Sequence, residues 1–271
     1  MKDDSYSSSS HTKKNYLKSN LRELPYFRAL LRAVESRFYD QLNFEEPILD
    51  LGCGDGLFGQ STFRQKITIG LDPKLKSLLE AHQTNIYHIL INSMGSGIPL
   101  PDQSISTVIS NSVLEHILQI DPVLEEIQRV CKIDALFVFC VPNENFTNQL
   151  SIGRFLEKLH LNWMAMQYRR FFNRISRHYH CDSPELWKKR LDKSGFKIER
   201  YWNYFSPDAL AALELGHYFG VPYWLLKQLS GKWVIFPGFI ERITYPLVKK
   251  YYFETPYQPL GAYTFFICKR I

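Results

Sequence analysis

The chain has 271 residues, of which 45% are hydrophobic and 22% charged, a composition typical of a soluble globular protein. Its net charge of +6 permits contact with anionic groups but is too small to indicate a nucleic-acid-binding protein. Five scattered cysteines form no CxxC pair, which argues against a disulfide framework or a structural zinc site and favours a cytoplasmic location.

The N-terminal segment is polar and serine-rich. Residues 1–18 lack the apolar stretch of a signal peptide, so we expect a mobile tail, followed by a single domain over 19–271. Apolar residues recur at helical spacing from Leu24 to Phe38, which predicts an amphipathic helix. Because no run of about 18 uninterrupted apolar residues follows, no transmembrane helix is predicted.

Strand and helix patterns then alternate along the chain. The strand patterns cover 48–51, 67–71, 86–91, 106–111 and 135–141, and the helix patterns cover 57–65, 74–83 and 121–130. This alternation predicts βαβ units and a doubly wound α/β fold, with a mostly parallel sheet that is covered on both faces.

Two segments interrupt the alternation, and both are predicted to be mainly helical insertions. Residues 144–182 are rich in Arg, His and aromatic residues, whereas 206–258 are strongly apolar and aromatic. A helix opened by Ser183 and strands at 196–204 and 261–268 complete the pattern. Because both insertions follow strands, they can reach the carboxyl edge of the sheet, where we expect them to cap an acceptor site.

A glycine-rich turn, Asp50-Leu-Gly-Cys-Gly-Asp-Gly56, follows the first predicted strand. Its glycines allow positive φ and let a ligand lie against the backbone. Asp72 closes the next strand, about 20 residues further on, where a carboxylate can accept both ribose hydroxyl protons of a nucleoside. A dinucleotide site has the spacing G-x-G-x-x-G, but here Leu57 stands at the position of its third glycine. Asp50 and Asp55 would repel a pyrophosphate but attract a sulfonium cation.

These residues resemble the first two cofactor motifs of class I S-adenosylmethionine-dependent methyltransferases. Residues 100–104 and 107–116 resemble the small-molecule branch of that family, which includes the quinone-biosynthesis enzymes. The resemblance implies a Rossmann-like methyltransferase fold with an antiparallel final strand, and S-adenosyl-L-methionine as the cofactor. It covers residues 46–142, 183–205 and 261–269, so both insertions lie outside it.

The resemblance also implies which residues bind the cofactor. They are Asp50, Gly52, Cys53, Gly54, Asp72, Ser93, Met94, Asn111 and Ser112. The glycine turn would hold the methionine part and Asp72 the ribose. Family members often carry an acid just after the third strand, beside the adenine, and this chain has Ser93 and Met94 there instead.

Methyl transfer is an in-line displacement, so the protein mainly aligns the acceptor and excludes water. His116 is the candidate general base, because imidazole titrates near neutrality and the neighbouring Glu115 could orient it. The alternative is that His116 is a helix-surface or cap residue. The cluster His178-Tyr-His-Cys-Asp182 matches no closed metal motif, so we expect loop residues and no metal site.

The aromatic insertions favour a small, hydrophobic or aromatic organic acceptor. The same residues could instead form ordinary helical core or a peripheral membrane patch, since lysines flank them. Three other functions stay open: a catalytically inactive methyltransferase-like binding module, an RNA methyltransferase, and a nicotinamide-dependent oxidoreductase. Asn111-Ser-Val-Leu114 stands where amino-directed nucleic-acid methyltransferases carry Asn-Pro-Pro-Tyr, which disfavours that type.

Overall fold

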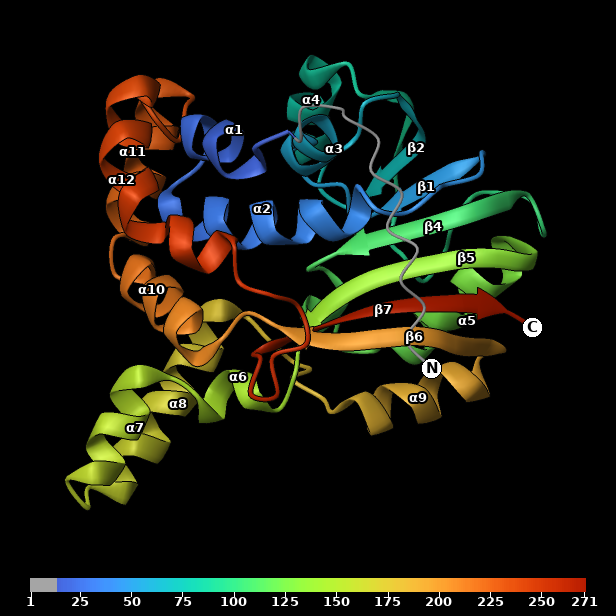
Figure 1. The fold of residues 1–271 in the computed structure, drawn as a ribbon. Helices are drawn as coiled ribbons and strands as arrows, with labels where there is room; N and C mark the ends of the chain where they lie inside the picture. Colours follow the sequence, from blue (N-terminus) through green and yellow to red (C-terminus); the bar gives the residue numbers. More distant parts are fainter. Residues whose placement is uncertain (1–13) are drawn as a thin grey trace.

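A sheet of seven strands forms the centre of the protein, with helices on both faces (Figure 1). The structure is a computed structural model that describes residues 14–271. The strands are β1 (Ile48–Leu51), β2 (Ile67–Asp72), β3 (Tyr87–Asn92), β4 (Ile105–Asn111), β5 (Cys131–Pro142), β6 (Phe196–Tyr204) and β7 (Tyr263–Arg270). Their order is β3-β2-β1-β4-β5-β7-β6. Strand β7 runs antiparallel to both of its neighbours, β5 and β6, and all other neighbouring strands pair in parallel. The predicted doubly wound, mostly parallel fold is confirmed.

Helices alternate with the strands as the sequence pattern predicts. They are α1 (Tyr16–Glu23), α2 (Tyr26–Tyr39), α3 (Leu57–Thr62), α4 (Leu75–Thr84), the 3-10 helix η1 (Leu114–His116), α5 (Asp121–Val130) and α9 (Pro184–Lys193). The Ser183 side chain accepts a hydrogen bond from the backbone N–H of Leu186, so Ser183 caps α9, as its position before a proline predicts.

The predicted tail ends earlier than expected. Helix α1 begins at Tyr16, and the side chains of Tyr16 and Leu17 are buried. The prediction is therefore wrong for residues 16–18, because this apolar pair packs into the core beside α2 and α12 (Pro237–Tyr252). The rest of the predicted tail, residues 1–13, lies outside the described residues.

Both insertions are mainly helical, as predicted. The first contains α6 (Asn145–Asn148), α7 (Ser151–Lys158) and α8 (Asn162–Ser176), and the second contains α10 (Pro207–His217), α11 (Gly220–Ser230) and α12. In Figure 1, α7 and α8 form a hairpin that projects from the body, whereas α11 and α12 lie beside α1. Helix α12 packs on α1 and α2, and α10 packs on α2. None of the described helices has both the length and the apolar character needed to cross a bilayer.

Two buried clusters, one on each face of the sheet, form the core. On β5, Val138 and Cys140 join the cluster that contains α2, whereas Phe137, Phe139 and Val141 join the cluster that contains α5 and α9. The two sets alternate because successive side chains of a strand point to opposite faces. Burial on both faces explains why β5 reads as a nearly continuous apolar run.

The strand order reverses between β1 and β4. Strands β2 and β3 continue the sheet on one side of β1, and β4 and β5 continue it on the other. At such a reversal a crevice opens beyond the carboxyl ends of the strands, because the two connections leave in opposite directions. The glycine turn after β1 and the segment after β4 meet at this crevice.

Candidate functional site

A turn with three left-handed glycines joins β1 to α3. The φ angles are +78° at Gly52, +55° at Gly54 and +75° at Gly56. The backbone N–H groups of Gly52 and Cys53 donate to the carbonyl oxygen of Leu71 on β2, at 2.7 and 3.1 Å, so the turn is tied to the neighbouring strand. No atom would lie within 4 Å of a Cβ built on Gly54, which leaves room for a ligand against the backbone there.

Asp72 lies at the end of β2, beside this turn, and its side chain is buried. Its carboxylate accepts hydrogen bonds from the backbone N–H groups of Gly54, at 3.0 Å, and Lys74, at 2.8 Å. The Asn92 side chain donates to the Asp72 carbonyl oxygen at 3.0 Å. These contacts fix the carboxylate, and each oxygen retains a lone pair that can accept a hydroxyl proton.

Asp50 is buried at the end of β1, where the Tyr87 hydroxyl donates to it at 2.6 Å. Burial raises the pKa of Asp50 to about 7; the hydrogen bond from Tyr87 opposes this rise, and the charge of Asp72 adds to it. A carboxyl group with this pKa changes charge near neutral pH, and a cation beside it would favour its ionised form.

Asn111 and Ser112, at the end of β4, contact a buried acid that the sequence analysis missed. The Asn111 amide donates to Glu35 at 2.8 Å, and the Ser112 hydroxyl lies 3.4 Å from the same carboxylate. The Tyr204 hydroxyl donates to it at 2.7 Å. Burial raises the pKa of Glu35, and these hydrogen bonds oppose the rise. No motif marks Glu35, because its partners are 76 and 169 residues away in the chain.

Ser93 and Met94 follow β3, in the loop where the resemblance places the adenine. The Met94 side chain is exposed, and the Ser93 hydroxyl donates to the carbonyl oxygen of Gly97 at 2.7 Å. Residues Asp72 and Asn92 are paired in register on β2 and β3, so this loop lies at the same edge of the sheet as Asp72.

His116 lies in η1, directly after the β4 segment. Its Nδ1 is 2.9 Å from the carbonyl oxygen of Arg177, which makes Nδ1 the protonated donor and leaves Nε2 as an acceptor. Burial lowers the pKa of His116, so the neutral ring is favoured. The carboxylate of Glu115 is 3.9 Å from Nε2, beyond hydrogen-bond distance. The Arg177 carbonyl therefore orients this imidazole, whereas Glu115, the expected partner, does not.

Glu115 is a fully buried acid whose Oε2 has no hydrogen-bond partner among the described residues. Burial raises its pKa well above the usual range, which favours the protonated form. The ring of His178 packs 5.3 Å from that of His116, and burial lowers the pKa of His178 to about 3. One ligand atom from each of these three residues lies within 4.8 Å of the others, a spacing that could hold a metal ion.

No spacing in the sequence connects these three residues. Residues 178–182, predicted to form a loop before a capped helix, lie in irregular backbone directly before α9. Within that loop, Asp182 accepts from Arg190 at 2.5 Å and lies 3.2 Å from His180. The expected absence of a metal stays a prediction.

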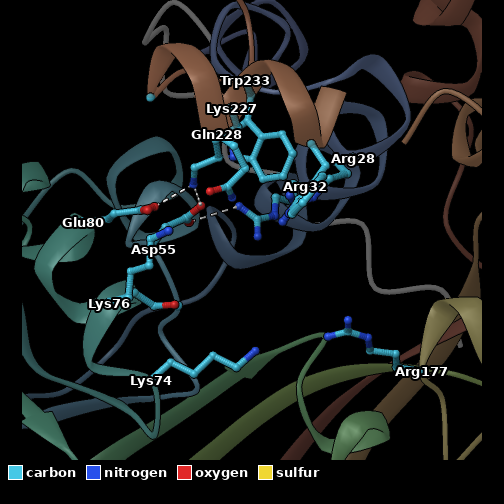
Figure 2. Close-up of a pocket in the computed structure, with 14 residues that line it drawn as sticks. Arg28, Arg32, Asp55, Lys74, Lys76, Glu80, Arg177, Lys227, Gln228 and Trp233 are labelled. Atoms are coloured by element: carbon cyan, nitrogen blue, oxygen red, sulfur yellow. Dashed lines mark hydrogen bonds and ion pairs between the residues drawn. The ribbon is translucent and has the colours of Figure 1, made fainter. Parts of the chain in front are cut away.

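A cavity of about 680 Å³ opens beside the glycine turn, between α2, α4 and α11 (Figure 2). Its volume is in the range of small-molecule sites. The charged residues that line it are Arg28, Arg32, Asp55, Lys74, Lys76, Glu80, Arg177 and Lys227. Gly54 and Asp55 belong to both the turn and the cavity wall, so a ligand held on the turn would extend into the cavity.

A second, smaller cavity of about 200 Å³ lies over the end of β4. It shares Arg28 and Arg32 with the larger cavity, and Asn111, Ser112 and His116 also line it. Its apolar lining includes Leu31, Phe146 and Tyr263. The candidate base therefore lines a separate compartment, and Arg28 and Arg32 of α2 border both cavities.

Comparison with known proteins identifies the family. Residues 20–201 match the family described as Methyltransferase domain. The chain belongs to this family. It is an enzyme of the S-adenosylmethionine-dependent type, and S-adenosyl-L-methionine is its cofactor.

Solved structures agree with this assignment at the level of the fold. A S-adenosylmethionine-dependent methyltransferase from Thermotoga maritima has a TM-score of 0.53 at 16% identity, over 93% of this chain and 91% of that one. Geranyl diphosphate C-methyltransferase from Streptomyces coelicolor, in complex with Mg²⁺ and S-adenosyl-L-homocysteine, has a TM-score of 0.52 at 13% identity. The match covers 91% of this chain and 81% of that one. No curated protein sequence matches this chain.

The residues at the crevice fit this cofactor. Asp72 offers two carboxylate oxygens to ribose hydroxyls, and the buried Asp50 offers negative charge to an ammonium or sulfonium. Arg32, which the sequence analysis also missed, has a buried Nη1 without a hydrogen-bond partner among the described residues, 3.9 Å from Asp55 beside the turn. A guanidinium at this position suits the carboxylate of the methionine moiety.

We expect S-adenosylhomocysteine to bind about tenfold more weakly at pH 6 than at pH 8, because Asp50, with its pKa of about 7, must be ionised to attract the ammonium group of this ligand. Affinity therefore falls as pH falls through that pKa. Titration calorimetry across this range measures the effect. The Asp50→Asn variant should bind with little pH dependence, whereas an unchanged affinity in the wild type would show that Asp50 does not face the ammonium.

Proposed function

We propose that this enzyme transfers a methyl group by in-line displacement to a small organic acceptor with a hydrophobic or aromatic part. The two cavities support this proposal, since one lies beside the glycine turn and the other places Leu31, Phe146 and Tyr263 in the same lining as the candidate base. The likeness of residues 100–116 to the quinone-biosynthesis branch also favours a small-molecule acceptor. The five unpaired cysteines fit a reducing compartment such as the cytoplasm.

Within this proposal each group at the crevice has a defined task. The glycine turn, Asp50 and Asp72 hold the cofactor, which when bound supplies an electrophilic methyl group. His116 accepts a proton at Nε2 from an acceptor hydroxyl or similar group, because its Nδ1 is already committed to the Arg177 carbonyl. Phe146 and Tyr263 exclude water from the smaller cavity.

Titration calorimetry with S-adenosylhomocysteine, beside NAD as a control, tests the cofactor assignment. We expect S-adenosylhomocysteine to bind and NAD not to bind, because Leu57 stands at the position of the third glycine of a dinucleotide site. With labelled cofactor, transfer to small aromatic acceptors and not to bulk RNA would support the proposed substrate class. Transfer to RNA alone, or no binding of the analogue, would contradict it.

We also propose that the α7–α8 hairpin contacts an anionic membrane surface. Residues 151–176 contain five basic residues and one acid, Glu157, which is paired with Arg169 at 2.5 Å. Large apolar side chains on the same hairpin are exposed, including Phe155 at 59% and Trp163 at 68%. The hairpin projects from the body, so both features are accessible (Figure 1). Basic and apolar side chains on one helix pair are typical of interfacial membrane binding.

Vesicle co-sedimentation at low salt tests this contact. We expect binding to vesicles that contain phosphatidylglycerol and little binding to pure phosphatidylcholine. The double variant Phe155→Gln, Trp163→Gln should bind the phosphatidylglycerol vesicles at least about tenfold more weakly, because it removes two exposed apolar side chains without changing the core. Leu229→Gln, at a still more exposed apolar site on α11, is the control. Equal partitioning of all three proteins would exclude the hairpin as the contact.

A further inference from the structure

The larger cavity carries more positive charge than its own carboxylates can neutralise. Six cationic side chains line it, whereas its only acids are Asp55 and Glu80. The Nζ of Lys227 lies 2.6 Å from Glu80, and Asp55 lies 3.9 Å from both Lys227 and Arg32. Even when Asp50 and Asp72 at the floor of the crevice are counted, the cations remain in excess by two.

Arg28 is the clearest unneutralised cation. Among the described residues it has no carboxylate at ion-pair distance, and its guanidinium lies over the ring of Trp233, 4.8 Å from the centroid. The Nζ of Lys227 lies at the same distance from that ring. Burial, together with the charge of Arg32, lowers the pKa of Arg28 to about 10, so it stays cationic at neutral pH. Because Lys227 is paired with Glu80, Arg28 is the cation on this indole whose charge remains available to a ligand.

Further cations close the cavity from the opposite side. In Figure 2, Lys74 and Arg177 point toward one another from opposite walls, below Arg28 and Arg32. The Arg177 backbone carbonyl is the group that orients His116, so this cationic wall adjoins the candidate base. An anion in the cavity would therefore lie beside Arg28 and Arg32, which also line the smaller cavity.

The cofactor cannot supply this negative charge. S-adenosylmethionine has one carboxylate, which Arg32 can bind, and two positive groups, so its binding adds to the excess. We infer that the acceptor carries a phosphate or diphosphate group, which Arg28, Lys74 and Arg177 bind while its apolar part enters the smaller cavity. A diphosphate bears several negative charges, whereas a single carboxylate would neutralise only one cation. This inference deepens the proposed function and depends on it.

Calorimetry with inorganic pyrophosphate, phosphate and benzoate, on the full chain saturated with S-adenosylhomocysteine, tests this anion site. We expect pyrophosphate to bind most tightly and benzoate to bind weakly or not at all. Arg28→Gln should weaken pyrophosphate about tenfold or more, and the binding of S-adenosylhomocysteine should change little, since Arg28 is not assigned to the cofactor. Arg242→Gln, an exposed position on α12, is the matched control. The melting temperature of each variant shows that it is folded.

The outcomes separate this inference from the proposed function. If S-adenosylhomocysteine binds but pyrophosphate does not, the anion site is excluded and the cofactor site stands. If Arg28→Gln binds pyrophosphate like the wild type, the contact is adventitious and the inference is overturned. If Arg28→Gln instead loses S-adenosylhomocysteine, Arg28 belongs to the cofactor and not to the acceptor. If neither molecule binds the wild type, both the inference and the proposed function are wrong.

Discussion

Asp72→Ala is expected to weaken S-adenosylhomocysteine binding by more than about 100-fold, the largest effect of any single substitution at the crevice. The carboxylate is held by the backbone N–H groups of Gly54 and Lys74, so its free lone pairs point to a fixed position. Two hydrogen bonds from ribose hydroxyls to a charged acceptor contribute about 1.5–3 kcal/mol each. Titration calorimetry measures the loss.

A control must separate this effect from damage to the turn, because Asp72 also holds the backbone at Gly54. Asp72→Asn keeps an acceptor oxygen for Gly54 but offers a poorer partner to two hydroxyls, so it should retain most of the stability and bind at an intermediate level. Asp192→Ala, at a half-exposed site on α9, should leave binding unchanged. If Asp72→Ala binds S-adenosylhomocysteine with wild-type affinity, Asp72 does not contact the cofactor.

Gly52→Ala is expected to destabilise the protein by about 2–4 kcal/mol, measured by urea unfolding. The backbone at Gly52 has φ +78°, which costs an alanine about 1–2 kcal/mol. The added Cβ would also lie 2.4 Å from Cγ1 of Val113, and overpacking of this kind typically costs about 1–3 kcal/mol. Val113 is β-branched and cannot rotate away easily.

Gly54→Ala is the matched control for this prediction. It has a similar positive φ of +55°, but no atom lies within 4 Å of its added Cβ, so only the backbone strain of about 1–2 kcal/mol should remain. Val113→Ala should partly rescue Gly52→Ala, because it removes the two methyl groups that the new Cβ would meet. Equal losses at both glycines, or no rescue, would show that the contact with Val113 does not matter.

Much of the scaffold could be predicted from local pattern. The apolar run of β5, the Ser-Pro start of α9 and the glycine turn each depend on neighbouring residues, so each was identified from sequence alone. The register of β2 and β3, which places Asp72 beside Asn92, was not predicted, because it depends on the pairing of two strands in the structure. The boundary at Tyr16 was missed because the burial of that residue depends on α12, far along the chain.

The contents of the cavity depended on contacts between distant segments. Arg28 and Arg32 stand in an ordinary amphipathic helix, and only the tertiary structure brings them near Lys227 and Trp233. His178 faces His116 for the same reason, since the first insertion folds back over η1. No spacing rule connects such residues.

The sequence by itself determined the class of fold, the glycine turn and the acid that closes the next strand, because these features are set by period and by φ within short segments. Only the tertiary structure decided which side chains share a compartment, which carboxyl groups lose water and shift their pKa, and where unneutralised charge collects. Those properties depend on burial and on distances through space, and burial is a property of the whole packed chain.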